Sequence, residues 1–200
     1  MASQQYDIWS VTPEADVDFY RAAATIGAAG PLTLAANVPG RNGYGFKVSV
    51  TSDGNDATTV FTITGTIVGK TTDGGIGTDT ITGVNTNTVS STQYFSSVTS
   101  VTSSATSAND VSVGYTADLA LPRTRVKGLY YVGAGSAGTI VITSPNVTAP
   151  LYKIITPTSA TSFADSLFMP AEGILVGNDA RDDYATVTVT NVTSFTLLCG

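Results

Sequence analysis

Apolar and polar residues alternate with a period of two along Gly45–Thr116, and three runs show this most clearly. One face of each run is apolar; its residues are Phe46, Val48 and Val50, then Phe61, Ile63 and Ile67, then Val111, Val113 and Tyr115. Because successive side chains of a strand point to opposite sides of a sheet, this pattern predicts strands with one buried face.

Turn-forming residues separate these runs, at Asp53–Asp56, Asp73–Gly75 and Asn109–Asp110. Gly65 interrupts an otherwise strong strand, which predicts a β-bulge or a close backbone neighbour. About six short strands at this spacing are typical of a sandwich or barrel.

A second β unit follows the first. The alternation breaks at Asp118–Arg123, where Pro122 disfavours a continuing central strand, and residues 124–200 then resume it. On the first strand of this unit, the pattern predicts one face with Val126, Tyr130 and Val132 and an opposite face with Arg125, Lys127 and Tyr131. Further along, Val187 and Val189 alternate with threonines. The fragments Val98–Thr102 and Val192–Thr196 resemble each other, although two copies fall short of a repeat array.

Residues 1–44 are irregular and predict an N-terminal arm with a leading strand at Leu32 and Leu34. Thr12 and Pro13 suit the start of a short helix, whose shared face would hold Val17, Tyr20 and Ala24.

Tyr6, Ile8 and Trp9 are large, apolar and too few to form a core. Either they pack on the chain's own core, or the arm docks on a neighbouring subunit with Trp9 as its anchor. The docking hypothesis predicts that deletion of residues 1–12 weakens assembly and leaves both β units folded.

The pattern as a whole predicts an all-β protein, sandwich or jelly-roll-like, with an arm at 1–44 and units at 45–118 and 124–200. Among the 200 residues, 42% are hydrophobic and only 12% are charged, so serine and threonine supply much of the polarity. The net charge of −6 and the absence of a Lys/Arg run argue against nucleic acid and anionic membranes as partners. The chain shows no signal-peptide pattern and no apolar run near the ~20 residues that a membrane span needs.

Catalytic signals are sparse. The chain has no histidine, and its one cysteine, Cys199, is next to the C-terminus, so Ser-His, Cys-His and imidazole-metal sites are excluded. Paired carboxylates remain open as a hydrolase site, but Glu14, Glu172 and Asp182–Asp183 lie in no recognisable motif. We therefore expect no enzymatic activity and no cofactor.

Residues Gly74–Thr82 fit a calcium-binding nonapeptide pattern, in which Asp79 would be a ligand. In such proteins the ion lies between stacked copies of the motif, and this chain has one copy. Oxygen ligands from a single turn rarely complete the 6–8 sites of calcium, so the alternative is a glycine-rich hairpin loop. Asp53 and Asp56 have a similar standing, and we expect no metal site.

Exposed aromatic side chains would favour a carbohydrate-binding module, whereas buried ones would indicate ordinary sheet packing. The candidates are Tyr44, Tyr94, Tyr130, Tyr131, Tyr152 and Tyr184.

Several segments together resemble small β-sandwich structural proteins of tailed bacteriophages, over most of residues 30–200. They are Gly30–Leu34, Phe61–Thr66, Tyr94–Val101, Val111–Gly114 and Phe168–Leu175 followed by Val187–Phe195. These are strand-and-turn patterns and carry over no functional residue. The resemblance implies a virion structural protein, assembled in the bacterial cytoplasm: a decoration or cement protein of the head, or a neck, tail or fibre component. Its implied partners are the major capsid protein, other virion proteins and further copies of itself, as a dimer or trimer.

The acidic charge favours a position outside the DNA-filled shell, because packaged DNA would repel the protein. The sequence therefore predicts a decoration protein on the outer head surface, with a neck, tail or fibre component and a carbohydrate-binding module as alternatives.

Overall fold

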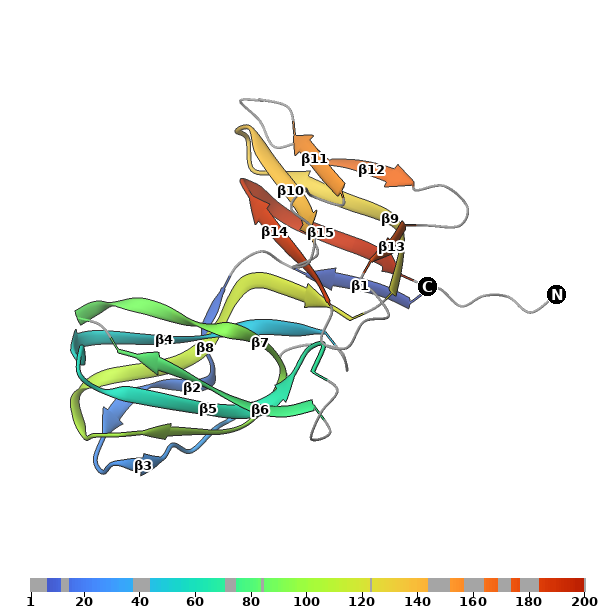
Figure 1. Ribbon diagram of the computed structural model, residues 1–200. Coiled ribbons are helices and arrows are strands. Elements are labelled where there is room, and N and C mark those ends of the chain that lie inside the picture. Colours follow the sequence, from blue (N-terminus) through green and yellow to red (C-terminus); the bar gives the residue numbers. More distant parts are fainter. Residues whose placement is uncertain are drawn as a thin grey trace. The chain divides into compact units, whose positions relative to one another are not determined.

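The computed structural model contains antiparallel strands and no helix in the residues that it describes, which confirms the all-β prediction (Figure 1). These residues are 7–11, 15–37, 44–70, 75–83, 85–122, 124–143, 152–156, 164–168, 174–176 and 184–199. The chain divides into two compact units: a first unit, Ala15–Leu119, and a second unit, Met1–Glu14 with Ala120–Gly200. The division between the units lies between Leu119 and Ala120.

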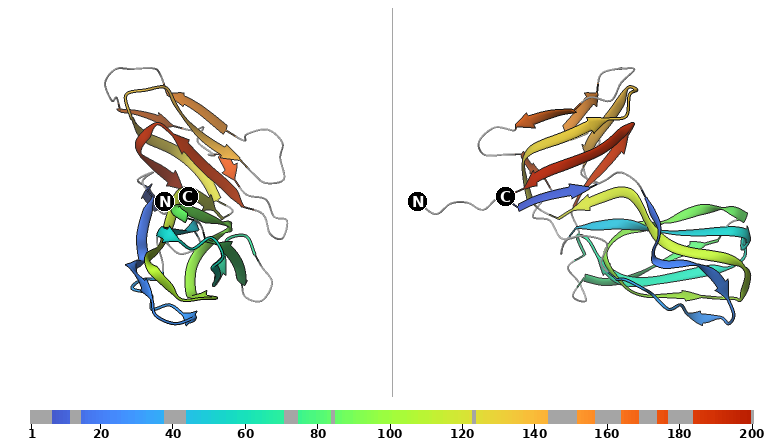
Figure 2. Two further views of the ribbon diagram at one scale, coloured as in Figure 1. Left: turned by 90° about the vertical axis from the view of Figure 1, so that its left-hand side faces the viewer. Right: turned by 180° about the vertical axis from the view of Figure 1, so that it is seen from behind.

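Seven strands belong to the first unit: β2 (Asp16–Ile26), β3 (Gly30–Pro31), β4 (Gly45–Asn55), β5 (Val60–Ile67), β6 (Ile76–Thr82), β7 (Asn85–Ser103) and β8 (Ser107–Leu121). Their pairing order is β8-β4-β7-β5-β6, with β2 on β8 and β3 on β7. The long strand β7 pairs first with β4, up to Phe95, and then with β5. It therefore joins two layers, which Figure 2 shows from two further sides. One layer contains β2, β8, β4 and the start of β7, and the other contains β3, the end of β7, β5 and β6.

The core of the first unit lies between these layers and draws on both. Its buried members are Tyr20, Ile26, Val48, Val50, Phe61, Ile63, Ile81, Phe95, Val98, Val101, Val111 and Val113. The apolar faces predicted for β4, β5 and β8 point into this core, with Ile67 and Tyr115 partly buried at its margin. Burying a large apolar side chain contributes about 1.5–3 kcal/mol to the stability of the fold. A strand that carries such side chains on one face is therefore stabilised with that face in the core, and for this reason the period of two predicts these strands.

The predicted bulge at Gly65 is present. The pairing register between β5 and β7 shifts between Thr64 and Gly65, so Thr99 is the extra residue on β7. A Cβ on Gly65 would lie 2.0 Å from the backbone oxygen of Ser97. Glycine is therefore required here by the close approach of the neighbouring strand.

The predicted helix at the start of the chain is wrong, because Asp16–Ile26 forms strand β2 on β8. Only Tyr20 and Ile26 of this strand are buried, and Val17 is exposed. Its register slips repeatedly, and a Cβ on Gly114 would lie within 2.6 Å of the backbone of Asp16 and Val17. Pairing with β8 thus overrides the helix propensity of the alanines at 22–24.

Five predicted turn residues also lie in strands: Asp53, Gly54 and Asn55 are the end of β4, and Asn109 and Asp110 are part of β8. The side-chain amide of Asn109 donates to Asp56 Oδ2 over 3.4 Å, and the Asp110 N–H donates to Asp53 Oδ1 over 2.8 Å. These bonds hold the start of β8 beside the end of β4 in an extended conformation. The turn lies earlier, around Ser104 and Ala105.

Eight strands belong to the second unit: β1 (Asp7–Val11), β9 (Thr124–Gly133), β10 (Gly138–Thr143), β11 (Tyr152–Thr156), β12 (Ala164–Phe168), β13 (Ile174–Val176), β14 (Ala185–Thr190) and β15 (Val192–Cys199). One set pairs in the order β1-β15-β9-β12, with β13 also on β9, and another in the order β11-β10-β14. Their buried side chains include Leu129, Tyr131, Ile140, Ile142, Val187, Phe195 and Leu197. Val187 is buried and its threonine neighbours are more exposed, as the alternation predicts.

The predicted faces of β9 are wrong beyond Val126. The register with β15 places Leu198 opposite Gly128 and Cys199 opposite Val126, so Lys127 is an extra residue. A one-residue bulge exchanges the two faces of a strand. Tyr131 is consequently buried and Tyr130 is 46% exposed, the reverse of the predicted arrangement.

The two similar pentapeptides share a local structure. In each, the threonine after the first valine is an extra residue of a bulge: Thr99 on β7 and Thr193 on β15. The valine before it lies opposite a glycine, Gly65 or Gly133. The threonine hydroxyl donates to a carbonyl of the partner strand, over 3.0 Å from Thr99 to Thr64 O and 3.5 Å from Thr193 to Gly133 O. The resemblance therefore marks a repeated bulge.

Replacing Tyr20 by phenylalanine is expected to leave the free energy of unfolding unchanged or to raise it by up to about 1 kcal/mol. The Tyr20 hydroxyl is buried and has no hydrogen-bond partner in the described part of the chain, and a buried unpaired polar group is destabilising. Burial, with a smaller contribution from Tyr115, raises the pKa of Tyr20 well above its ordinary value of about 10.

The change of stability with pH in wild-type protein and in the Tyr20→Phe variant provides a second test of this substitution. A pKa raised in the folded state contributes stability below the unfolded-state pKa, and this contribution is lost as the pH rises through the folded value. Wild-type protein should therefore lose stability above about pH 10 more steeply than the Tyr20→Phe variant in denaturant titrations. A clear loss of stability in this variant at neutral pH would show that the hydroxyl has a partner.

Candidate functional site

The carboxylate of Asp79, the candidate calcium ligand, binds protein donors. Its Oδ2 accepts from the Thr92 N–H at 2.7 Å, the Gln93 N–H at 2.9 Å and the Thr92 hydroxyl at 2.9 Å. Its Oδ1 accepts from the Thr80 N–H at 2.8 Å. Burial would raise the pKa of Asp79, but these hydrogen bonds outweigh it and lower the pKa below its ordinary value. The carboxylate is therefore held in its charged form by strand β7.

The N–H groups of Thr92 and Gln93 are available to Asp79 because β7 bends here, where it passes from one layer to the other. Lys47 pairs with Tyr94 and Ser49 pairs with Ser90, so three residues of β7 face one residue of β4. The Ser91 hydroxyl accepts from the N–H of Val48 at 2.9 Å, and Asp79 accepts the amides of Thr92 and Gln93. Asp79 thus fastens strand β6 to the bend of β7. Residues 71–74, which include Gly74 of the nonapeptide, lie outside the described residues.

A second carboxylate, Asp56, is only 2% exposed. Its Oδ2 accepts from the Ser52 hydroxyl at 2.5 Å, the Ser107 hydroxyl at 3.1 Å and the Asn109 amide at 3.4 Å. On sequence alone, Asp56 is a turn residue and a weak calcium candidate. Its carboxylate instead connects the ends of β4 and β8, because it accepts hydrogen bonds from Ser52 of β4 and from Ser107 and Asn109 of β8.

No group of three or more His, Cys, Asp or Glu residues that could hold a metal occurs in the described ranges. Glu14, Glu172 and Asp182–Asp183, the other carboxylates considered, lie outside those ranges. The backbone of Cys199 is the end of β15. In the same ranges there is also no helix long and apolar enough to cross a membrane.

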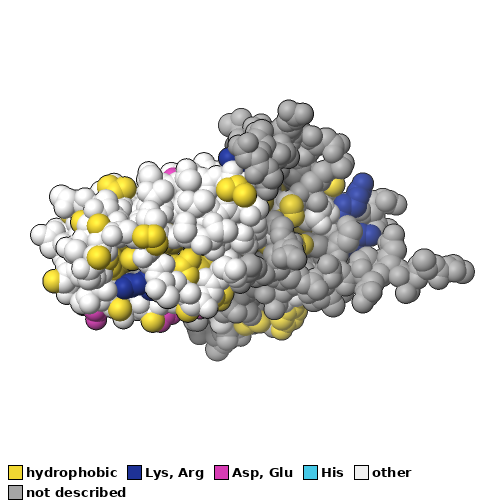
Figure 3. Space-filling model, turned by 90° about the horizontal axis from the view of Figure 1, so that it is seen from below, with side chains coloured by type: hydrophobic (Ala, Val, Ile, Leu, Met, Phe, Trp, Pro, Cys, Tyr) yellow, Lys and Arg dark blue, Asp and Glu magenta, His cyan; other side chains and the backbone are white. Residues whose placement is uncertain are grey.

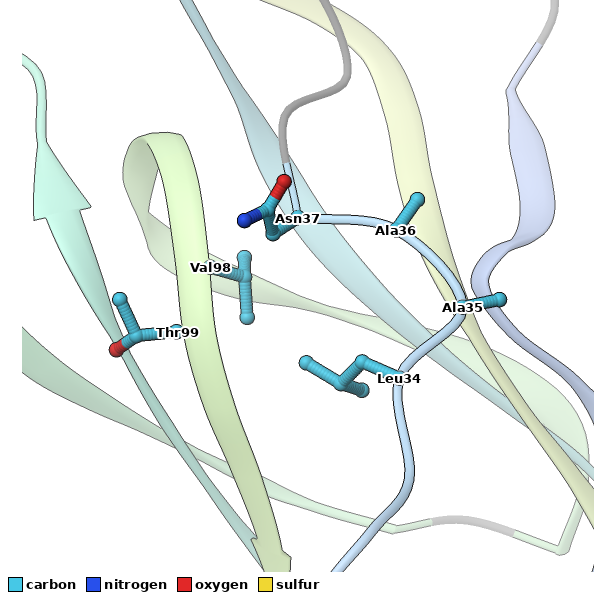
Figure 4. Close-up of a pocket in the computed structure, with 6 residues that line it drawn as sticks. All are labelled: Leu34, Ala35, Ala36, Asn37, Val98 and Thr99. Atoms are coloured by element: carbon cyan, nitrogen blue, oxygen red, sulfur yellow. The ribbon is translucent and has the colours of Figure 1, made fainter.

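A hollow of about 450 Å³ lies between strand β7 and the segment 32–37. This segment is fastened to β7 at two points, by Leu32 N–H to Val101 O and by Val98 N–H to Asn37 O, both at 2.8 Å. Figure 4 shows Leu34 and Asn37 directed toward Val98 from across the hollow. Its polar side chains are Asn37 and Thr99, and Thr99 donates to Thr64 O. An amide, a hydroxyl and aliphatic groups provide neither an acid–base pair nor an activated nucleophile.

The tyrosine candidates for sugar binding are mostly enclosed. Tyr94 and Tyr131 are buried, and Tyr44 and Tyr184 are half-buried. Tyr130 is exposed on β9, opposite Thr196 of β15 and Ser166 of β12. Tyr152 is on β11, and its side chain lies outside the described set.

The predicted arm divides between the two units. Ile8 and Trp9 are on β1, whose backbone pairs with β15, in register with Leu198 and Leu197. Tyr6 lies outside the described residues. The backbone of residues 7–11 is thus an edge strand of the second unit, as in the first of the two alternatives for the arm. Contact of Tyr6, Ile8 and Trp9 with a neighbouring subunit stays a prediction.

Deleting residues 1–12 is therefore expected to lower the thermal stability of the second unit, because the deletion removes the strand that pairs with β15. The first unit, which does not include these residues, should retain its own melting transition. Calorimetry of full-length and truncated protein measures both transitions. Unchanged melting combined with weaker assembly would instead support the docking arm.

The outer face of β5, β6 and the end of β7 is free of charged side chains. The pairing register arranges it in three rows, each running from β6 across β5 to β7: Thr80, Thr62 and Thr102; Thr78, Thr64 and Ser100; Ile76, Thr66 and Ser97. We call these nine residues the hydroxyl face. All nine are exposed or half-buried, and Ile76 is 52% exposed. Figure 3 shows that uncharged atoms predominate on the side of the first unit turned to the viewer.

The other layer of the first unit carries charge on its outer side. Lys47 of β4 lies 3.8 Å from Asp118 of β8. Arg21 of β2 donates to the carbonyl oxygens of Val111, Ala24 and Thr25, which the slipped register of β2 leaves available. Burial lowers the pKa of Arg21, and Asp110 partly counteracts this. No sequence pattern indicates this role of Arg21, because it depends on the irregular pairing of β2.

Comparison of the chain with family models, with curated proteins and with solved structures finds no match.

Proposed function

We propose that this protein is a non-enzymatic structural protein of a tailed-bacteriophage virion, a decoration or cement protein on the outer surface of the head. The observation that carries the proposal is the hydroxyl face, a three-stranded sheet surface without charged side chains. Such a surface can bind another protein without removing water from charged groups, a step that opposes association.

Two further observations support this function. Both units consist of antiparallel strands, as the resemblance to phage β-sandwich proteins over residues 30–200 implies. The net charge of −6 favours a position outside the DNA-filled shell. The proposed partners are the major capsid protein and further copies of this chain, and the proposed location is the virion.

Co-sedimentation of purified protein with empty phage heads, and separately with isolated tails, tests this function. Saturable binding to heads is the expected result, and the mass of the free protein in solution reports whether it is a monomer, dimer or trimer. Binding to tails alone would assign a neck, tail or fibre role. Binding to neither, together with glycan binding that is lost in a Tyr130→Ala variant, would favour a carbohydrate-binding module.

A further inference from the structure

We infer that the hydroxyl face is the surface through which this protein contacts a repeated protein lattice, and that the contacted surface is itself uncharged at its centre. This inference rests on the proposed function and adds the docking surface and the chemistry of the partner.

The hydroxyl groups of this face are partly satisfied within the sheet. The Ser97 hydroxyl donates to Thr66 Oγ1 at 3.0 Å, and the Thr102 hydroxyl donates to Thr62 O at 3.5 Å. At the bulge beside the face, Thr99 donates to Thr64 O at 3.0 Å. Donors that already bind the sheet do not lose a hydrogen bond when a partner displaces surface water, so docking costs no hydrogen bond at the Ser97 and Thr102 hydroxyls.

The face is also firmly supported from behind. Phe61 and Ile63 alternate with Thr62 and Thr64 along β5, and both are fully buried in the core. A surface that is already ordered loses little conformational entropy on binding. Gly65 lets β7 approach β5 closely at this point, so the rows of the face lie side by side.

The free edge of β6 is less suited to bind a partner strand. The Lys70 ammonium donates to the backbone oxygen of Ile76 at 2.5 Å, and Asp79 accepts the N–H of Thr80. Ile76 and Thr80 are four residues apart on the same strand, so these two backbone groups face the same edge, and side chains bind both. Charged side chains at an edge strand oppose edge-to-edge pairing. Docking therefore uses the face of the sheet rather than its edge.

The chemistry of the partner follows from the absence of charge. A charged partner group brought against the hydroxyl face would lose water without gaining an opposite charge, and such burial is unfavourable. The matching surface must consequently present aliphatic, hydroxyl or amide groups at its centre.

The size of the face decides between a stable dimer and a lattice. About five residues at ~3.3 Å by three strands at ~4.8 Å give a face of roughly 240 Å². A stable pair of proteins usually buries about 800 Å² on each partner. One contact through this face is therefore weak, and it becomes strong only when copies joined to one another, as in the proposed dimer or trimer, bind a repeating surface together.

Lysine substitutions on the hydroxyl face test this inference. Thr64→Lys places a charge at the centre of the face, and Thr78→Lys places one at an exposed position of β6. The matched control is Thr88→Lys, at an exposed position of β7 where Thr88 pairs with Thr51 of the other layer. Thermal melts of each variant identify any loss of folding, and Thr78→Ser keeps the hydroxyl without adding charge.

The expected result is a loss of head binding of about ten-fold or more for Thr78→Lys and Thr64→Lys, with Thr88→Lys and Thr78→Ser binding like wild type. If wild-type protein binds heads and the two face variants bind equally well, the docking surface is elsewhere and the inference is wrong. If wild-type protein binds no particle, the proposed function itself fails. If wild-type protein is a dimer and Thr78→Lys makes it a monomer, the hydroxyl face binds a second copy of this chain instead of a lattice. That result would overturn the inference.

Discussion

Replacing Asp79 by alanine is expected to lower the free energy of unfolding of the first unit by about 2 kcal/mol. The substitution leaves the N–H groups of Thr92, Gln93 and Thr80 without their acceptor, and hydrogen bonds to a charged group are the stronger kind. The effect stays moderate because the site is near the surface and water replaces part of the loss. Asp79→Asn, which keeps an acceptor oxygen without the charge, should lie between the alanine variant and wild type in urea titrations.

The lowered pKa of Asp79 also predicts how the stability of the first unit changes with pH. The pKa of Asp79 is lowered in the folded state, so the carboxylate contributes stability above the unfolded-state pKa of about 3.9 and loses it as the pH falls through the folded value. The difference in stability between wild type and Asp79→Asn should therefore be full at neutral pH and disappear in acid. A difference that persists unchanged at low pH would show that the charge is not responsible.

Chelation separates this role from a calcium site. Because protein donors bind the Asp79 carboxylate, EDTA should leave the melting temperature of wild-type protein unchanged. A fall of several degrees in EDTA would revive Asp79 as a metal ligand, since removing a ligand that binds the folded state lowers stability.

Replacing Gly65 by alanine is expected to lower the free energy of unfolding of the first unit by about 2–3 kcal/mol. The new methyl group would lie 2.0 Å from Ser97 O and 3.0 Å from Phe95 Cδ1. The first of these atoms is backbone in the middle of the sheet, so strands β5 and β7 have to separate. The matched control is Gly27→Ala, where no atom lies within 4 Å of the added Cβ.

Urea titrations of the two glycine variants measure this difference. The Gly27→Ala variant should unfold within about 0.5 kcal/mol of wild type, the usual range for surface substitutions. Equal stability of the two variants would mean that the approach of β5 to β7 is looser than the structure shows. If the hydroxyl face docks as proposed, Gly65→Ala should also weaken head binding, because the separation of β5 and β7 changes the spacing of its rows.

The local pattern of the sequence determines strands β4, β5 and β8 of the first unit. Phe61, Ile63, Val111 and Val113 are buried as the alternation predicts, because the burial of one face of a strand is a property of its own residues. Gly65 also has a local signal, because a glycine within a run of β-branched residues often marks a bulge or a closely approaching backbone.

Tertiary pairing decided the features that local patterns misplace. Asp16–Ile26 became a strand because β8 offers it an edge and Gly114 allows close approach. Tyr130 and Tyr131 exchanged faces because one extra residue at Lys127 shifts the register with β15. Such a bulge depends on the partner strand, and the alternation along β9 alone does not reveal it.

The candidate site shows the same division. The sequence by itself determined that the chain has much threonine, little charge and a lone glycine-rich turn before Asp79. Only the tertiary structure decided that threonines of two strands and hydroxyl residues of a third align in rows, and that Asp79 binds the bend of β7. The physical reason is that composition and alternation act within one strand, whereas a surface and a hydrogen-bond acceptor are shared between strands far apart in the chain.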